Sequence, residues 1–258
     1  MTRSATNKPD SEGIKKEFTF RFYAELNDFL TLNRKQKAFV HAFKTPITVR
    51  ETIESLGVPL SEVDMILVNG TSADFEHKLS ECDYISVYPV FETLDVSVIT
   101  KVRKTALRTT LFVVDTHLGK LAKYLRMLGF DTLYRSDIGD DEIIAVAKKE
   151  KRIILTRDKS LLRSKEISHG YFVRSTEKHE QLREVVDKFD LRSQFKSFTR
   201  CITCNTSLVK TDKEEIRNRV EEDIFRIFNA FFYCKQCDKL YWKGSHFKRM
   251  ETYIRDLI

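Results

Sequence analysis

One stretch of the sequence decides the fold of its second half: residues 111–134, LFVVDTHLGKLAKYLRMLGFDTLY. It opens with a continuous apolar run, Leu111–Val114, which has the length of a buried strand. Over His117–Leu128 the apolar residues recur at helical spacing with lysines on the opposite face, and Gly129 then ends the helix. Asp131–Tyr134 has the pattern of a second short strand. The order strand, helix, strand predicts a parallel βαβ unit.

The same alternation continues downstream. The next segments have the spacing of a helix, two strands and a further helix, in the order Asp140–Lys149, Arg152–Thr156, Tyr171–Arg174 and Glu177–Phe189. Strands that alternate with helices at these lengths favour a parallel sheet with right-handed crossovers. The fold class predicted for this part of the chain is therefore α/β, with a parallel sheet flanked by helices.

The composition is that of a globular protein. Of the 258 residues, 41% are hydrophobic and 32% are charged, and the 19 Phe against 8 Gly and 4 Pro exclude collagen-like and wholly disordered classes. No stretch approaches the roughly 18 consecutive apolar residues of a membrane helix, and the polar start lacks the apolar core of a signal peptide. We therefore expect a soluble, cytoplasmic protein with no membrane partner.

The chain carries a net charge of +7, and the excess of Lys and Arg falls after residue 100. A basic half favours polyanionic partners, of which nucleic acid is the commonest. A lysine-rich surface that only keeps the protein soluble is the alternative. Charge alone therefore suggests nucleic-acid binding without deciding it.

Changes in composition divide the chain into segments. Residues 1–16 are polar and are predicted to form a disordered tail. Strands around one helix, Glu51–Leu56, then predict a small α+β domain over residues 17–97. Its strands are expected at Phe18–Phe22, Met65–Val68 and Tyr84–Pro89, with a tight turn at Asn69-Gly70. There follow a basic linker (98–110), the α/β domain (111–198) and a cysteine-containing segment with a C-terminal helix (199–258).

Four of the five cysteines form two CxxC pairs, Cys201 with Cys204 and Cys234 with Cys237. Each pair lets two thiolates reach one ion, and two pairs complete a tetrahedral four-cysteine zinc site. Four unrelated core cysteines are the alternative, and disulfides are unusual in a cytosolic chain. Four thiolates leave no open coordination position, so we expect a structural Zn²⁺ ion. Between the pairs, the apolar spacing of Asp212–Phe228 predicts a helix.

Acidic residues stand at the ends of predicted strands. Asp115 follows the first strand of the α/β domain, and Asp158 comes two residues after the strand that ends at Thr156. Asp140 and Asp141 open the helix between these strands. Ligands of a parallel sheet collect at the carboxyl ends of its strands, and carboxylates there suit Mg²⁺ or Mn²⁺, which can orient a water for attack on a phosphodiester. Caps of the following helices are the alternative role for these acids.

Several separate blocks of the second half agree in order and spacing with one known family. The blocks are residues 115–132, 140–144, 152–158, 200–205 and 232–250. Together they resemble the Mut-seven C-terminal (Mut7-C) RNase family, a group of PIN-like nucleases, over roughly residues 111–250. The first domain is similar to the ubiquitin-like module that precedes this nuclease domain in many bacterial members, on the strength of residues 21–30, 54–59 and 63–70.

The resemblance implies a metal-dependent ribonuclease that hydrolyses RNA phosphodiester bonds. Carried over to this sequence, Asp115, Asp140 and Asp158 hold a divalent ion, Mg²⁺ or Mn²⁺, and Asp141 is a substitute for Asp140. The cations expected to contact RNA are Lys120, Lys123, Arg126, Arg157, Lys243, Lys248 and Arg249. A structural ion pair is the alternative for Arg126. A non-catalytic RNA-binding or ribosome-associated adaptor that kept the fold is the competing interpretation.

The resemblance also implies three folds in series. These are a β-grasp domain over residues 17–97, a PIN-like domain over 111–198, and a zinc ribbon with a C-terminal helix over 199–258. Sulfur carriers of β-grasp shape end in a free Gly-Gly, whereas this chain runs on through Phe91–Asp95, so carrier chemistry is excluded. A docking surface for a protein partner is one role for this domain, and a folding or solubility partner is the other. For Trp242 we expect a place in the ribbon core, although aromatic residues near cations can also stack bases.

Overall fold

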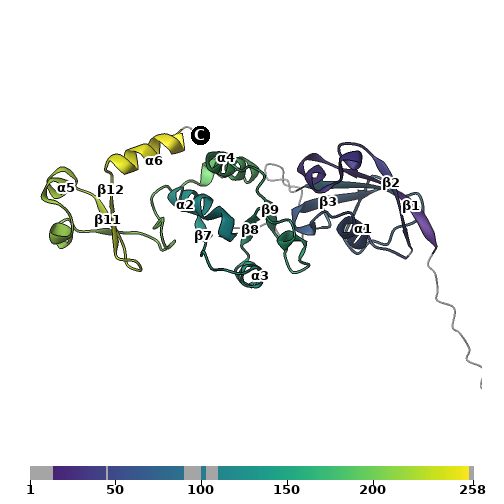
Figure 1. Ribbon diagram of the computed structural model, residues 1–258, viewed down its shortest axis with the longest axis horizontal. Coiled ribbons are helices and arrows are strands. Elements are labelled where there is room, and N and C mark those ends of the chain that lie inside the picture. Colours follow the sequence, from purple (N-terminus) through teal and green to yellow (C-terminus); the bar gives the residue numbers. More distant parts are fainter. Residues whose placement is uncertain (1–13, 45, 90–99, 103–109, 256–258) are drawn as a thin grey trace, which may run out of the picture. The chain divides into compact units, whose positions relative to one another are not determined.

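The computed structural model describes residues 14–44, 46–89, 100–102 and 110–255 of the chain (Figure 1). The chain divides into two compact units, Met1–Ala106 and Leu107–Ile258. Residues 1–13 of the expected disordered tail (1–16) and most of the expected basic linker lie outside the described residues, whereas Lys15 and Lys16 belong to a strand and correct the end of that tail. In the described ranges, no helix has the length and apolar character needed to cross a lipid bilayer.

The first unit contains a mixed five-stranded sheet with the order β2-β1-β5-β3-β4. The parallel pair β1 and β5 is flanked by antiparallel neighbours. The elements are β1 (Lys15–Phe22), β2 (Phe39–Lys44), α1 (Val49–Ser55), β3 (Val63–Val68), β4 (Thr71–Ala73) and β5 (Tyr84–Pro89). This is the expected β-grasp fold.

Local sequence signals account for most of this unit. The alternation in β1 buries Phe18, Phe20 and Phe22 in the core, and the strand begins at Lys15, two residues before the expected domain start. Thr48 and the glutamate at N3 of α1 form a capping box that starts the helix. Asn69-Gly70 turns the chain from β3 to β4 with positive φ at both residues, as this dipeptide predicts.

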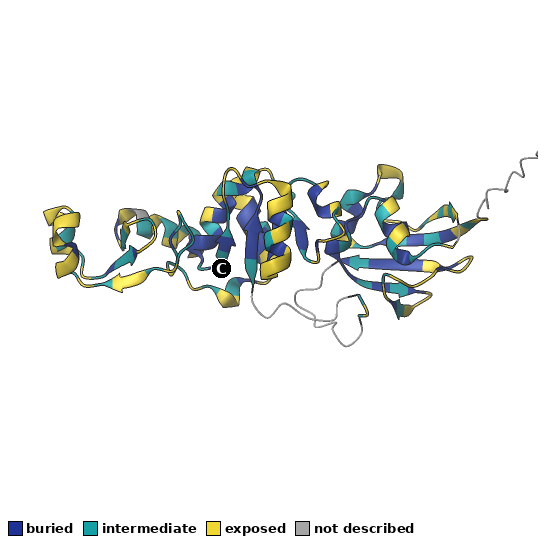
Figure 2. Cartoon of the chain, turned by 90° about the horizontal axis from the view of Figure 1, so that it is seen from below, coloured by how far each residue is buried: buried dark blue, intermediate teal, exposed yellow. Residues whose placement is uncertain are grey.

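The second unit is built on a parallel four-stranded sheet with the order β7-β6-β8-β9. Its elements are β6 (Leu111–Val114), α2 (Gly119–Met127), β7 (Asp131–Leu133), α3 (Asp140–Glu150), β8 (Ile153–Thr156), β9 (Gly170–Phe172) and α4 (Lys178–Lys188). Side chains of α2 and α4 pack with Phe112 and Val114 on one face, and side chains of α3 pack with Val113 and Ile154 on the other. The two central strands are therefore buried on both sides (Figure 2).

Most element boundaries of this sheet and its helices lie within one residue of the sequence prediction, and two differ by two residues. The helix expected from His117 begins as a short 3-10 helix, Thr116–Leu118, and becomes α2 at Gly119. Strand β9 is shorter at its end than expected, because the backbone N–H of Arg174 donates to the Glu184 carboxylate at 2.8 Å instead of to a neighbouring strand. The parallel α/β class itself is confirmed.

The ribbon is an antiparallel sheet of β10 (Val209–Thr211), β11 (Phe231–Cys234) and β12 (Lys239–Trp242). Helix α6 (Ser245–Arg255) follows it and returns to the α/β core, where Met250, Tyr253 and Ile254 pack. In Figure 1 this helix runs from the ribbon toward α4. The ribbon and the α/β sheet are thus joined through packed side chains.

The helix predicted over Asp212–Phe228 is wrong. The segment forms a 3-10 helix, Glu214–Arg219, and then the short α5 (Glu222–Ile227), separated by Val220 in an extended conformation with φ −134° and ψ 157°. Of the expected apolar stripe, Ile216 is buried but Ile227 is 64% exposed. A continuous helix would have no core to pack against on that side, and helical stability comes mainly from such packing.

Candidate active site and metal centre

The acids singled out in the sequence lie at the carboxyl edge of the parallel sheet, near enough for their charges to act on one another. Among the described residues they do not form a group of three or more side chains close enough to hold one metal ion together, as four cysteines of the ribbon do. Strands β6 and β8 are neighbours with Val114 opposite Leu155, and the N–H of Asp115 donates to the Leu155 carbonyl at 3.0 Å. Asp115 therefore leaves β6 beside the end of β8, close to where the chain continues to Asp158. Ligands of parallel α/β sheets gather at this kind of edge.

Asp115 is buried and held by two hydroxyl groups. The residue is 5% exposed, and its Oδ2 accepts a hydrogen bond from Thr156 Oγ1 at 2.7 Å. Thr116 Oγ1 donates to Oδ1 at 3.1 Å. Thr156 Oγ1 also accepts from the N–H of Asp158 at 2.8 Å, so one buried hydroxyl connects the two acids. The carboxylate caps no N–H of the following turn, which removes the helix-cap alternative for Asp115.

Asp158 is half-buried and kept anionic by its neighbours. Its Oδ1 accepts from the backbone N–H of Ser160 at 2.7 Å and from the Ser160 hydroxyl. These hydrogen bonds are the main reason that the pKa of Asp158 lies below its ordinary value, and the nearby His117 contributes in the same direction. His117, whose side chain is exposed, therefore lies near this carboxylate.

Asp140 is the first residue of α3 and is exposed at the same edge. Burial and the negative charges of Asp158, Asp115 and Asp141, in this order, raise its pKa. The N-cap of α3 is Gly139, so Asp140 does not cap the helix, and the alternative raised from the sequence does not hold for it. Asp141 follows on the exposed first turn, where it adds a further negative charge.

Lysine and arginine side chains do not neutralise these acids within the described residues. In the described part of the chain, no lysine or arginine forms an ion pair with Asp115, Asp140 or Asp158. The negative charges of Asp158, Asp115 and Asp141 around Asp140, without a lysine or arginine ion pair in the described residues, favour a bound cation. Carboxylate oxygens suit hard cations such as Mg²⁺, which keeps several waters and needs only one or two direct protein ligands.

A second cluster, formed by four cysteines, lies in the ribbon. The Sγ atoms of Cys201, Cys204, Cys234 and Cys237 all lie within 4.8 Å of one another, with Cys201 to Cys237 at 3.4 Å and Cys204 to Cys234 at 3.3 Å. At a Zn–S distance of about 2.3 Å, tetrahedral ligands stand about 3.8 Å apart. The group can therefore hold a metal ion, and thiolates at this spacing suit zinc. Among the described residues, no other group of three or more His, Cys, Asp or Glu side chains lies close enough together to hold a metal ion.

The surroundings of Cys201 favour its thiolate. Burial alone would raise its pKa, but the Tyr241 hydroxyl, 3.0 Å from Sγ, and the N–H groups of Cys204 and Thr203 lower it to about 6. The pKa of Cys204 is lowered as well, whereas burial is the main reason that the pKa values of Cys234 and Cys237 are raised. Because a metal ligand must be deprotonated, metal binding has to displace protons from this second pair.

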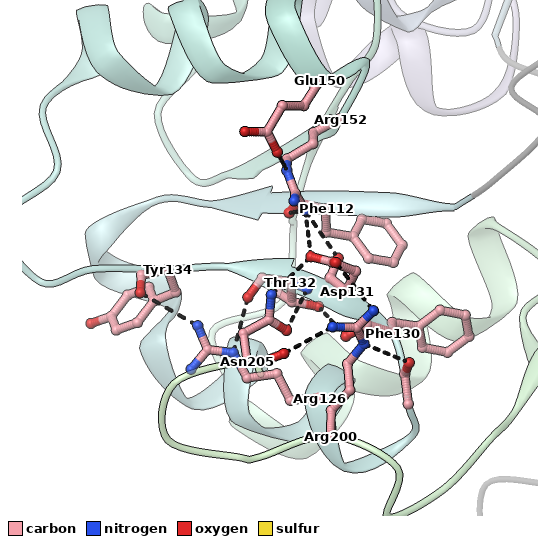
Figure 3. Close-up of polar contacts among 11 residues, drawn as sticks. Phe112, Arg126, Phe130, Asp131, Thr132, Tyr134, Glu150, Arg152, Arg200 and Asn205 are labelled. Carbon is pink, nitrogen blue, oxygen red and sulfur yellow. Dashed lines mark hydrogen bonds and ion pairs between the residues drawn. The ribbon is translucent and has the colours of Figure 1, made fainter. Parts of the chain in front are cut away.

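The first cysteine knuckle is attached to the α/β sheet by a polar network (Figure 3). Asp131 of β7 accepts hydrogen bonds at its Oδ1 from Arg152 at 2.7 Å and from Asn205 at 2.8 Å, and its Oδ2 lies 3.1 Å from Arg200. Asn205 Oδ1 accepts from the N–H of Thr132 at 3.0 Å. Burial alone would raise the pKa of Asp131, but these partners outweigh burial and lower it.

Arg126 belongs to the same network and corrects a prediction. Its side chain, 2% exposed, donates to the carbonyl oxygens of Thr132 at 2.9 Å and Thr203 at 2.7 Å, and at longer distance to Ile202 and Tyr134. The expectation that Arg126 contacts RNA is therefore wrong, because its guanidinium is enclosed by backbone carbonyls. The expected ion pair is not its main role either, since its partners are neutral carbonyls.

Known families match both parts of the chain. Residues 110–254 match the Mut7-C RNAse domain, and residues 15–95 match the Mut7-C ubiquitin domain. The chain belongs to the Mut7-C RNAse domain family. The matched span covers more than half of the chain and includes the sheet, the ribbon and most of α6. No curated protein matches the chain.

The remaining expected cations of the Mut7-C RNAse domain differ in their availability. Arg157 is half-buried, and its Nη1 donates to the carbonyl oxygens of residues 173, 174 and 175, so this group braces the end of β9. The other five are exposed: Lys120, Lys123, Lys243, Lys248 and Arg249. The two on α2 follow closely after Asp115.

Sequence reasoning missed Thr156 as a member of the site. A threonine that ends a buried strand has the pattern of an ordinary strand residue, and its hydroxyl partners come from two different strand ends. The sequence did contain one signal for Thr156: a polar residue at the end of an otherwise apolar strand, two positions before Asp158.

Proposed function

We propose that this chain is a metal-dependent ribonuclease that hydrolyses RNA phosphodiester bonds with a divalent ion held by Asp115, Asp140 and Asp158. The observation that carries the proposal is the set of like-charged acids at the carboxyl edge of a Mut7-C RNAse domain, without an ion pair to lysine or arginine among the described residues. An Mg²⁺ or Mn²⁺ ion bound there supplies water activation and offsets charge on the leaving oxygen.

The protein's own part in this reaction is to position oxygen ligands. Asp115 is the rigid ligand, because its two oxygens are fixed by Thr156 and Thr116. Asp158 stays ionised well into the acid range, since Ser160 stabilises its carboxylate. Asp140 is exposed and has a raised pKa, so it is the ligand that gains most when a cation arrives. Asp141, the next residue of α3, is the alternative to Asp140 as this ligand.

Exposed cations of the second unit hold the RNA in the proposal. The exposed Lys120 and Lys123 follow Asp115 on α2, and Lys243, Lys248 and Arg249 lie on the ribbon and α6. Contacts of this kind bind the phosphate backbone without reading sequence. A Zn²⁺ ion in the four-cysteine group has a structural role here, because four thiolates leave no position for water. The β-grasp domain is proposed to dock a protein partner.

RNA cleavage by matched variants tests the proposal. A mixed RNA pool is incubated with the zinc-loaded full chain and Mg²⁺ or Mn²⁺, beside Asp115→Asn, Asp158→Asn and the control Asp137→Asn. Asp137 is exposed and lies 3.4 Å from Arg135, so its loss should leave cleavage unchanged. The two site variants should lose cleavage and keep RNA binding, because the cationic surface is untouched.

Metal removal complements the variants. EDTA should stop cleavage, and Mg²⁺ or Mn²⁺ should restore it in protein whose zinc content is unchanged. If both site variants cut as fast as the wild type, the carboxylate site is wrong. If no protein cuts any RNA although RNA binds, the non-catalytic adaptor replaces the ribonuclease.

A further inference from the structure

A large cavity lies between the ribbon and the C-terminal helix. Its volume is about 780 Å³, within the roughly 300–1,000 Å³ typical of small-molecule sites. Its walls come from β11, β12, α6 and the segment that enters the ribbon. Much of the wall is aromatic, with Phe198, Phe232, Tyr241, Trp242 and Phe247 among the lining residues.

The aromatic rings of this cavity are fixed by their neighbours. The ring centroids of Phe198 and Phe247 lie 3.9 Å apart. Trp242 has Phe231 behind it at 6.3 Å between centroids, and a Cβ added to Gly244 would lie 2.8 Å from the indole nitrogen. Trp242 is therefore half-buried against the ribbon, as expected of a core residue, but it also lines an open cavity.

The rim of the cavity is basic. Lys243 and Arg255 are exposed lining residues, and Glu251 is the single acid among the described residues that line the cavity. The ammonium of Lys243 lies 5.3 Å from the centroid of the Phe247 ring. The adjacent turn of α6 adds the exposed Lys248 and Arg249. An apolar peptide would not need this excess of positive charge, whereas a ligand with flat rings on an anionic chain matches both the walls and the rim.

We propose that this cavity binds unpaired bases of single-stranded RNA, with the neighbouring phosphates at Lys243, Lys248 and Arg249. The inference rests on the proposed function and adds to it a preference for single strands. Bases of a duplex are already stacked on their neighbours, so they are not available to enter an aromatic cavity. Aromatic walls stack any base, and the site therefore selects strandedness rather than sequence.

Tryptophan fluorescence reports on this cavity directly, because Trp242 is the chain's one tryptophan. The zinc-loaded full chain, without added Mg²⁺ or Mn²⁺, is titrated with a single-stranded RNA 12-mer and with a hairpin duplex of similar length. Anisotropy of a dye on the RNA measures total binding in the same samples. We expect the single strand to quench Trp242 in step with binding, and the duplex to bind without comparable quenching.

A matched pair of variants separates stacking from charge. Phe247→Leu removes one ring of the cavity and should weaken single-strand binding about tenfold, the equivalent of one base stack of about 1.4 kcal/mol. Phe225→Leu is the control, since Phe225 also lies under cations, Lys213 at 4.8 Å and Arg217 at 5.3 Å, but does not line the cavity. Zinc content and near-UV circular dichroism identify any variant that fails to fold, and Lys243→Gln then serves as the second probe.

The outcomes distinguish this inference from the ribonuclease proposal. Single-stranded RNA that binds without quenching Trp242, or that binds Phe247→Leu as tightly as wild type, overturns the cavity site and leaves the ribonuclease standing. Equal quenching by duplex overturns the preference for single strands. If an apolar peptide changes the fluorescence of Trp242 and RNA does not, the occupant of the cavity is a protein segment and the RNA proposal is overturned. Quenching in a protein that cuts no RNA supports the cavity and contradicts the catalytic proposal alone.

Discussion

Arg126 offers a sharp test of how the ribbon and the α/β sheet are held together. Replacing it with methionine keeps most of the aliphatic volume but removes every donor to the carbonyls of Thr132, Thr203, Ile202 and Tyr134. Two of these bonds, at 2.9 and 2.7 Å, have good geometry, and the other two are long. Thr132 is 0% exposed, so its carbonyl would lose a buried donor, whereas the carbonyl of the exposed Thr203 would turn to solvent.

The expected loss of stability in Arg126→Met follows from these hydrogen bonds. A hydrogen bond with a charged partner contributes about 1.5–3 kcal/mol, and part of this gain is offset because methionine no longer carries a desolvated charge. Two good bonds therefore give a net loss of about 3–5 kcal/mol in the free energy of unfolding of the second unit. At about 2–4 °C per kcal/mol for a domain of this size, the melting temperature should fall by about 6–20 °C.

The assay is thermal unfolding followed by the fluorescence of Trp242, which lies in the second unit, together with the rate of zinc transfer to a colorimetric chelator. Arg126→Met should melt earlier and lose zinc faster, since two of the lost acceptors belong to the knuckle between Cys201 and Cys204. Arg183→Met is the control, because that side chain is 50% exposed and should change stability by less than about 0.5 kcal/mol. A variant that melts and holds zinc like the wild type but loses RNA affinity would show that Arg126 contacts phosphate after all.

Three further results are expected. Cys201→Ser and Cys234→Ser should each release the metal, which a zinc assay measures. Because the first knuckle is hydrogen-bonded to the sheet, Cys201→Ser should also lower the stability of the α/β part, which hydrogen exchange measures. A wild-type protein whose ribbon is folded with less than one zinc per chain would contradict this prediction. Gly129→Ala should cost about 2–4 kcal/mol in thermal unfolding, since φ is +100° and the new Cβ would collide with the Lys196 carbonyl; an unchanged melting temperature would be the contrary result. Asp131 has a folded-state pKa below its unfolded value of about 3.9, so its contribution to stability is complete above about pH 3.9 and disappears as the pH falls through the folded pKa. Asp131→Asn should therefore be less stable than wild type at pH 7, and the difference in their free energies of unfolding should narrow in acid. A difference independent of pH would refute the assignment of this stability to the Asp131 carboxylate.

The sequence predicted the elements whose signals are local. The β6–α2–β7 unit follows from an apolar run, a helical stripe and Gly129, and the turn at Asn69-Gly70 follows from the dipeptide. Strands β2 and β4 were missed, because β2 is an edge strand whose exposed positions include Val40 at 57%, and β4 has only three residues. Short edge strands are specified by their neighbours more than by their own pattern.

What the sequence could not supply were partners that are distant along the chain. Arg126 has the pattern of a surface cation on α2, and its burial depends on the carbonyls of Ile202 and Thr203, which the ribbon brings to it. The helix expected over Asp212–Phe228 failed for the same reason, since periodicity indicates a helix only where a core receives its apolar face. The sequence could place Asp115 and Asp158 at one edge because the ends of parallel strands meet by topology, and it could place Asp140 at the start of the helix between those strands. Their role as metal ligands stays a prediction.

Binding of Mn²⁺ tests the central claim most directly, because it reports on the acids without requiring the right RNA. Electron paramagnetic resonance of the zinc-loaded chain should reveal a Mn²⁺ site that leaves the zinc in place. Asp115→Asn, Asp140→Asn and Asp158→Asn should each weaken Mn²⁺ binding at least about tenfold, since even residues behind the ligands cost this much, while Asp137→Asn should bind as the wild type does. Equal Mn²⁺ affinity in all four variants, or Mn²⁺ that binds only by displacing zinc, would contradict the account.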